Sequence, residues 1–320
     1  MEIVERKNLS NKTIFIDGFW GSGKSLLFSL INDQKILTRF IIDQSIEDFF
    51  ALNNIGKIDD QTLKFLVNNR RDILLFYHQI GRHTNMRLSD DTGPNDLLEL
   101  INNLRRSFKS YKTIEIEKKI KAQKKSLPIM IHCCINSNEK MFEIWGESLR
   151  YIHICRHPLD VYKHTYKYVN DFFNSSISFE LKLSINNNTT ILPSFVANII
   201  SKYEKISTLK PTDISIICIS EYTKQMCRYF KNNCSNRLFI DFDQLTNNTI
   251  ESLNFIVKDF LGYKNHNLKS INFKKYNLPR NLLQNKIDRY AIYKEIKKNK
   301  IEKNVLKLLD ESIDIYEKTF

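Results

Sequence analysis

Short apolar runs alternate along the chain with segments in which apolar residues recur every three or four positions. The short runs, which we predict to be buried strands, are residues 13–16, 128–132, 150–155, 213–220 and 237–241. Helical spacing is found over residues 24–31, 43–53, 60–69, 72–80, 95–107, 138–149, 159–170, 193–205, 248–261 and 291–320. This alternation predicts an α/β fold in which a parallel sheet is flanked by helices.

The pattern shows no internal repeat and no linker, so we expect a single domain over residues 1–320. The mostly helical stretch from about 35 to 125 is predicted to be an insertion into the α/β pattern, and the Lys-rich residues 264–320 a largely helical tail. The polar, Asn/Ser-rich segment 171–192 is predicted to be a loop that either closes over a ligand or stays open.

The composition shows that the protein is basic. The 320 residues contain 49 Lys+Arg and 36 Asp+Glu, a formal net charge of +13, which favours an anionic partner or a basic solvated surface. No nucleic-acid-binding motif accompanies the charge, so we expect no nucleic acid. The six cysteines form no CxxC pair, which predicts reduced thiols and a cytoplasmic protein without a zinc site. No apolar run reaches the length of a transmembrane helix.

The clearest candidate chemistry is a phosphate-binding loop between the first strand and the first helix. Residues 18–25, GFWGSGKS, match the Walker A pattern G-x-x-x-x-G-K-[ST]. Glycines let the backbone amides turn toward a phosphate, and the following helix adds its positive end. The candidate nucleotide-binding residues are therefore Gly18, Gly21, Ser22, Gly23, Lys24 and Ser25.

An NTPase also needs an acid that holds Mg²⁺ at the end of a second strand. Glu221 follows one predicted strand, and Asp241 and Asp243 follow another. None of the three stands out from an ordinary turn or cap residue.

Two further segments resemble the sulfotransferases that use 3′-phosphoadenosine 5′-phosphosulfate (PAPS). Residues 151–161, YIHICRHPLDV, resemble the family's apolar strand followed by R-x-P-x-D-V. Residues 238–262 resemble its strand, Y-E-D-L turn and helix ending in F-L-G, and with the loop the resemblance spans about 14–262. It implies that Arg156 binds the 3′-phosphate, with His164 in the place of a family serine, and that Lys24 stabilises the leaving 5′-phosphate.

The resemblance also suggests a general base. In the cytosolic branch a histidine ends the strand before the R-x-P strand, and His132 has that place here. A histidine with a near-neutral pKa suits the removal of a proton from an acceptor hydroxyl. The alternative is a structural histidine, and other branches of the family use a carboxylate; His153, inside the next strand, is expected to be structural.

Some positions depart from the family. Gly21 stands where the loop has a lysine or arginine, and Lys24 comes three residues later, as in kinases. The family's C-terminal glycine-basic loop has no clear match, and Arg280 is a weak substitute.

The polar loop 82–93 is the candidate acceptor site. Its candidate substrate-binding residues are Arg82, His83, Arg87 and Asp90, and such a loop suits a saccharide or another polar acceptor. His83, Asp90 or Asp91 are alternative bases. A solvated turn-rich loop is an equal interpretation.

Three functions follow from these patterns. The first is a PAPS-dependent sulfotransferase, without a metal, acting on a hydroxyl or amine of a glycan or cell-envelope precursor. The second is a P-loop kinase that uses Mg-ATP on a small molecule or sugar, which the intact G-K-S favours. The third is a non-catalytic nucleotide-binding module. Metal dependence separates the first two, because Ser25 would hold Mg²⁺ in a kinase.

Overall fold

The computed structural model describes most of the 320 residues. The described ranges are 8–9, 12–34, 36, 41–82, 86–87, 93–94, 97–123, 126–137, 139–174, 181–185, 190–200, 209–232, 234–276, 278, 289–299 and 301–320. Every structural statement below concerns these residues.

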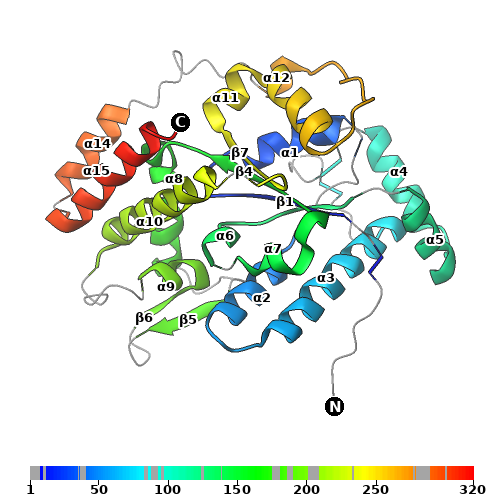
Figure 1. The fold of residues 1–320 in the computed structure, drawn as a ribbon, viewed down its shortest axis with the longest axis horizontal. Helices are drawn as coiled ribbons and strands as arrows, with labels where there is room; N and C mark the ends of the chain where they lie inside the picture. Colours follow the sequence, from blue (N-terminus) through cyan, green and yellow to red (C-terminus); the bar gives the residue numbers. More distant parts are fainter. Residues whose placement is uncertain are drawn as a thin grey trace.

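A five-stranded parallel sheet lies at the centre of the fold (Figure 1). Its strands are β1 (Thr13–Gly18), β2 (Ile41–Ile42), β3 (Pro128–Met130), β4 (Leu149–Cys155) and β7 (Arg237–Asp241). The spatial order is β2-β3-β1-β4-β7, so β1 has β3 on one side and β4 on the other. The predicted α/β class with a parallel sheet is confirmed.

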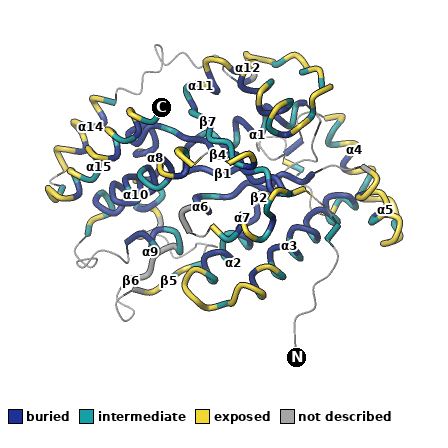
Figure 2. The backbone as a smooth tube through the Cα atoms, viewed as in Figure 1, coloured by how far each residue is buried: buried dark blue, intermediate teal, exposed yellow. Residues whose placement is uncertain are grey.

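All six residues of β1 are buried, because helices cover both faces of the sheet (Figure 2). Ile14 and Ile16 join a cluster with the apolar side chains of α1 (Lys24–Asp33). Phe15 points to the opposite face and joins Ile46 and Phe50 of α2 (Gln44–Asn54). The alternation along β1 thus attaches one helical layer to each face.

The remaining elements follow in chain order. They are α3 (Asp60–Ile80), α4 (Leu97–Ser107), α5 (Thr113–Gln123), α6 (Cys134–Ser137), α7 (Lys140–Trp145), η1 (Gly146–Ser148), α8 (Pro158–Asn174), the hairpin strands β5 (Lys182–Ile185) and β6 (Thr190–Pro193), α9 (Ser194–Ile200), α10 (Pro211–Lys231), α11 (Phe242–Asn247), α12 (Thr249–Asn254), the π-helical η3 (Phe255–Phe260), α13 (Phe273–Tyr276), α14 (Arg289–Lys298) and α15 (Lys303–Glu317). Among the described helices, none combines the length and the apolar character needed to cross a bilayer.

The strand predicted over residues 213–220 is wrong, because this run lies inside α10. Pro211 occupies the first turn of the helix, and the backbone amide of Lys210 donates to the Asp213 carboxylate at 3.2 Å. Residues 214–220 are buried without exception, among α8, α9 and α15. A helix buried on every side has no polar face, so its apolar run looks like that of a buried strand.

Four smaller predictions also change. The two helices predicted over 60–69 and 72–80 are the single helix α3, and the helix predicted over 138–149 shortens to α7 followed by η1. The segment predicted to be a loop over 171–192 includes the last turn of α8 and the antiparallel hairpin β5–β6. The helix predicted over 291–320 is divided into α14 and α15.

Candidate functional site

The loop from Gly18 to Ser25 connects β1 to α1, as predicted. Two of its glycines have left-handed backbone conformations, with φ of +75° at Gly21 and +103° at Gly23. A Cβ at Gly21 would lie 2.7 Å from His164 of α8, and one at Gly23 would lie 2.3 Å from the ring of Phe242 of α11. The loop is therefore enclosed between His164 and Phe242, and both glycine positions lack room for a side chain.

Lys24 is buried at the start of α1 and folds back onto the loop. Its Nζ donates to the carbonyl oxygens of Gly18 at 2.6 Å and Phe19 at 2.8 Å. Burial is the main cause that lowers its pKa, against the opposing charges of Cys133, Asp17 and Glu47. An ammonium has three donors, so a third remains for a phosphate oxygen.

Arg156 directly follows β4, at the carboxyl end of the strand beside β1. Its Nη1 donates to the carbonyl oxygen of Gly21 at 2.5 Å, and its guanidinium carbon lies 4.4 Å from the centre of the Phe242 ring. The structure therefore places the cation of the R-x-P element on the rim of the phosphate loop, next to the exposed His164.

His132 lies two residues beyond β3, on the other side of β1. Its Nδ1 lies 3.0 Å from Oε1 of Glu47 on α2, and its backbone amide donates to the same oxygen at 3.0 Å. Burial lowers the pKa of His132 to about 3, with a smaller contribution from Lys24. Burial likewise raises the pKa of Glu47 well above its usual range, followed by repulsion from Asp17. Both directions disfavour charge, so the pair favours a neutral imidazole beside a protonated carboxyl.

The structure adds Glu47 to the candidate site, a residue that the sequence analysis missed. Glu47 lies in the first turn of the helix that follows β2, at the carboxyl edge of the sheet where doubly wound folds bind ligands. The residue after His132, Cys133, has a φ of +53°, which is rare for a residue with a side chain. Its Sγ contacts the carbonyl oxygen of Gly18 at 3.8 Å, so the turn that presents His132 packs on the phosphate loop.

A chain of buried hydrogen bonds lies beneath the loop. The Tyr151 hydroxyl donates to the Asp17 carboxylate at 2.6 Å and lies 2.8 Å from Nδ1 of His153. On the other side of that ring, Nε2 pairs with the Tyr222 hydroxyl, which accepts from the backbone amide of Phe19 at 3.1 Å. Since a carboxylate only accepts and an amide only donates, one proton order satisfies the chain: His153 is neutral and carries its proton on Nδ1.

The other predicted site residues are dispersed. Ser22 is buried, and its hydroxyl has no hydrogen-bond partner among the described residues, while Ser25 is half-buried in the first turn of α1. Arg82 and Arg87 are exposed, and Arg82 lies over the Tyr77 ring at 5.4 Å. The remaining predicted residues, His83, Asp90, Asp91 and Arg280, lie outside the described residues. The structure thus brings Lys24, His132, Arg156 and His164 around the loop, whereas of the predicted acceptor residues it describes only the exposed Arg82 and Arg87.

The acids considered for Mg²⁺ have other partners in the structure. Asp241 caps α11 by accepting from the Gln244 amide at 2.9 Å, and Asp243 pairs with Arg289 at 3.2 Å. Glu221 is on α10 and follows no strand. Within the described ranges, no cluster of three or more histidine, cysteine or carboxylate side chains could hold a metal ion.

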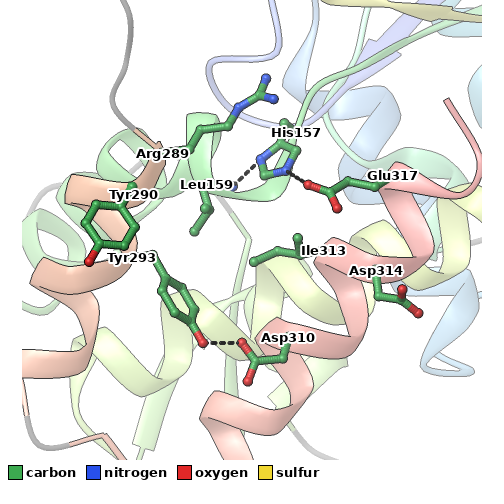
Figure 3. A pocket seen from close by; sticks show the side chains of 9 residues that line it. All are labelled: His157, Leu159, Arg289, Tyr290, Tyr293, Asp310, Ile313, Asp314 and Glu317. Carbon is green, nitrogen blue, oxygen red and sulfur yellow. Dashed lines mark hydrogen bonds and ion pairs between the residues drawn. The ribbon is translucent and has the colours of Figure 1, made fainter.

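A pocket of about 340 Å³ opens between the start of α8 and helices α14 and α15 (Figure 3). His157 lies at its inner end, with Nε2 3.6 Å from Glu317, and Tyr293 donates to Asp310 at 2.5 Å. No residue of the phosphate loop lines this pocket. Arg156 and His157 are adjacent in sequence, but Arg156 contacts the loop and His157 contacts the C-terminal helix, so this pocket is separate from the candidate site.

Comparison with known proteins finds solved structures that resemble this one, but no family that matches by sequence. No family model matches the chain, and no curated protein matches it. The structure is similar to the sulfotransferase domain of the Synechococcus PCC 7002 olefin synthase, at 12% identity and a TM-score of 0.39, over 98% of this chain and 97% of that one. It is also similar to the sulfotransferase STF9 from Mycobacterium avium, at 13% identity and a TM-score of 0.37, over 92% and 78%. Because identity and TM-score are both low, the proposals below rest on the chain's own residues.

The buried His153 predicts an acid-sensitive fold. Burial lowers the pKa of His153 from 6.5 to about 4, so below the higher value the unfolded chain binds a proton that the folded chain excludes. The contribution to stability is complete above the unfolded pKa and is lost as the pH falls toward 4, at about 1.4 kcal/mol per pH unit.

Urea unfolding, repeated from neutral pH down to about 4, measures this slope. His153→Gln, which keeps a hydrogen-bonding side chain without the titration, is expected to reduce the slope by about 1.4 kcal/mol per pH unit and to leave the part due to His132, whose pKa is also lowered. An identical slope in the two proteins would show that His153 is not the group responsible.

Proposed function

We propose that the chain is a PAPS-dependent sulfotransferase that transfers a sulfuryl group to a hydroxyl or amine. One observation carries the proposal. The two strands that flank β1 lead into basic or proton-accepting side chains, Arg156 after β4 and His132 after β3, on either side of the phosphate loop. A nucleotide kinase needs a metal-binding acid at such a strand end.

The residues fit a doubly phosphorylated, sulfated nucleotide. The left-handed glycines let the loop turn tightly between His164 and Phe242, and the buried Ser22 hydroxyl is a group that a phosphate oxygen would satisfy. Lys24 and the amino end of α1 would hold the 5′-phosphosulfate, and Ser25 would assist. Arg156 and the exposed His164 would hold the 3′-phosphate.

PAPS, when bound, supplies an activated sulfuryl group, and the chain's own task is then to move a proton. Because the pKa of Glu47 is raised, its carboxyl must lose a proton before His132 can act as a base. Once Glu47 is ionised, Nδ1–H of His132 donates to Glu47, and Nε2 is left as the acceptor for the proton of the attacking hydroxyl. Glu47 thus orients the ring and stabilises the cation that forms, as a carboxylate does in other His-carboxylate pairs. The His132 side chain is 26% exposed, which leaves it accessible to an acceptor.

We propose a glycan or cell-envelope precursor as the acceptor. The support is the polar loop 82–93, which follows α3, and the net charge of +13, which suits an acidic or polar saccharide. Arg82, His83, Arg87 and Asp90 are the proposed contacts, and a cytoplasmic site of action agrees with the six unpaired thiols.

A P-loop kinase is the second candidate, and the complete G-K-S sequence at the start of α1 favours it. Its weakness is the lack of a metal-binding acid at the strand ends beside the described loop. A non-catalytic module would keep the nucleotide contacts and show no turnover.

Thermal unfolding with nucleotides distinguishes the candidates. Adenosine 3′,5′-bisphosphate without a metal, at about 100 times its dissociation constant, is expected to add about 2.7 kcal/mol and raise Tm visibly. Arg156→Ala should abolish most of this shift, whereas Arg82→Ala, the exposed-arginine control, should keep it. Stabilisation by Mg-ATP alone would move the kinase to first place.

Substitution of the His132–Glu47 pair tests the base. His132→Asn and Glu47→Gln are expected to lower the rate of sulfuryl transfer by about 10²–10⁴-fold, the range for loss of general base catalysis. Both variants should retain the thermal shift with the bisphosphate, because neither side chain is proposed to touch the 3′-phosphate. Unchanged turnover in His132→Asn would contradict the assignment, and binding without turnover in the wild type would favour the non-catalytic module.

A further inference from the structure

Helix α4 turns most of its apolar residues toward solvent. Asn103 is the only buried residue of the helix, and it accepts from Arg106. Leu100 and Arg106 are half-buried, and Ser107 is exposed although its hydroxyl lies near Gly81, where an added Cβ would be 3.3 Å away. A surface helix ordinarily packs its apolar stripe on a core, whereas α4 buries a single polar residue.

The outward side forms a continuous apolar stripe. Leu97, Ile101 and Leu104 recur at helical spacing and are 65%, 44% and 43% exposed. Phe108, one residue beyond the helix, continues the stripe at 87% exposure, and Leu98 flanks it at 66%. Contiguous exposed side chains of this kind mark an interaction site, whereas scattered ones need no explanation.

Basic side chains follow the apolar stripe. Arg105, Lys109 and Lys112 are exposed, whereas Arg106 turns to Asn103. No acidic residue occurs between Glu99 and Glu115. Figure 1 shows α4 and α5 at one edge of the molecule, and Figure 2 marks many residues of both helices as exposed. The apolar and cationic groups are therefore presented together at a free edge of the described structure.

We propose that the surface formed by Leu97, Leu98, Ile101, Leu104 and Phe108, with the basic residues beside it, docks on an anionic lipid surface. An amphipathic helix with Leu and Phe on one side and Lys and Arg beside them lies in the plane of such an interface. Each cation near the surface adds attraction to anionic headgroups. This proposal goes beyond the transferase function and does not depend on it.

A second copy of the chain is the competing occupant, because the spacing of Leu97, Ile101, Leu104 and Phe108 also suits a short helix–helix seam. Pairing two copies would bring their Arg and Lys side chains together at the edges of the seam, which is unfavourable. A chain with a net charge of +13 adds a further general repulsion. Charge therefore favours the lipid surface.

Co-sedimentation of the full chain with vesicles tests the proposal. Binding is expected to vesicles of equimolar phosphatidylcholine and phosphatidylglycerol, to weaken with added salt, and to be much weaker with phosphatidylcholine alone. Ile101→Asp with Leu104→Asp is expected to weaken binding by at least ~10-fold per residue. The control is Ile250→Asp on α12, a 53% exposed isoleucine outside the surface, which should bind as the wild type does.

Two further measurements keep the result decisive. Each variant is used only if its Tm matches that of the wild type, and Lys109→Glu with Lys112→Glu offers a second, charge-only variant that should lose the preference for anionic vesicles. Absence of binding by the wild type, or equal binding by the Ile101/Leu104 variant, would overturn the proposal. A dimer in sedimentation velocity that this variant converts to a monomer would assign the surface to a second copy instead.

Discussion

The hydrogen-bonded chain from the Asp17 carboxylate to the Phe19 amide is the constraint on which the candidate site depends. At one end the carboxylate accepts from the backbone amide of Gly18 at 2.6 Å, and at the other Tyr222 accepts from that of Phe19. These two contacts fix the first two residues of the phosphate loop. An unpaired polar group buried this deeply would destabilise the fold. The series of hydrogen bonds therefore permits one arrangement of its protons and one conformation of the loop entrance.

The same series of hydrogen bonds connects the phosphate loop to the elements that carry the rest of the site. Tyr151 and His153 belong to β4, which ends at Arg156, and Asp17 also accepts from the Ile135 amide just beyond His132 at 3.2 Å. Tyr222 attaches α10, the helix that packs on α8 and α15. The loop, the strand that leads to Arg156 and the segment just beyond His132 are therefore joined by one buried network. Such a network holds the groups of the candidate site in fixed positions relative to one another.

The sequence predicted those parts of the candidate site whose residues lie close together along the chain. The loop is readable because eight consecutive residues, a strand and a helix all agree, and Arg156 is readable because it follows an apolar strand directly. Glu47 was missed because it meets His132 only through the packing of α2, 85 positions away in sequence.

Burial explains the errors in the predicted elements. The apolar spacing divided α3 between residues 69 and 72. Arg71 and Asp72 are both buried there, and Arg71 donates to Asp72 and to Thr13 Oγ1 at 3.0 Å, so the helix continues through them. Inside α10 the apolar run has no solvent-facing side to reveal its helical period. The spacing of apolar residues indicates which side of an element faces solvent. It therefore mispredicts elements that have no solvent-facing side and elements whose charged residues are paired inside the protein.

Calorimetric titration of the wild type with adenosine 3′,5′-bisphosphate and with adenosine 5′-phosphate, in the absence of metal, tests the central claim most directly. The account predicts that the 3′-phosphate strengthens binding by at least ~10-fold, as a charge-assisted contact to Arg156 should. It also predicts that this ratio falls toward one in Arg156→Ala, because Arg156 supplies the main charged contact and only His164 would remain. Equal affinity of the wild type for the two nucleotides would contradict the account, because Arg156 would then not recognise a 3′-phosphate.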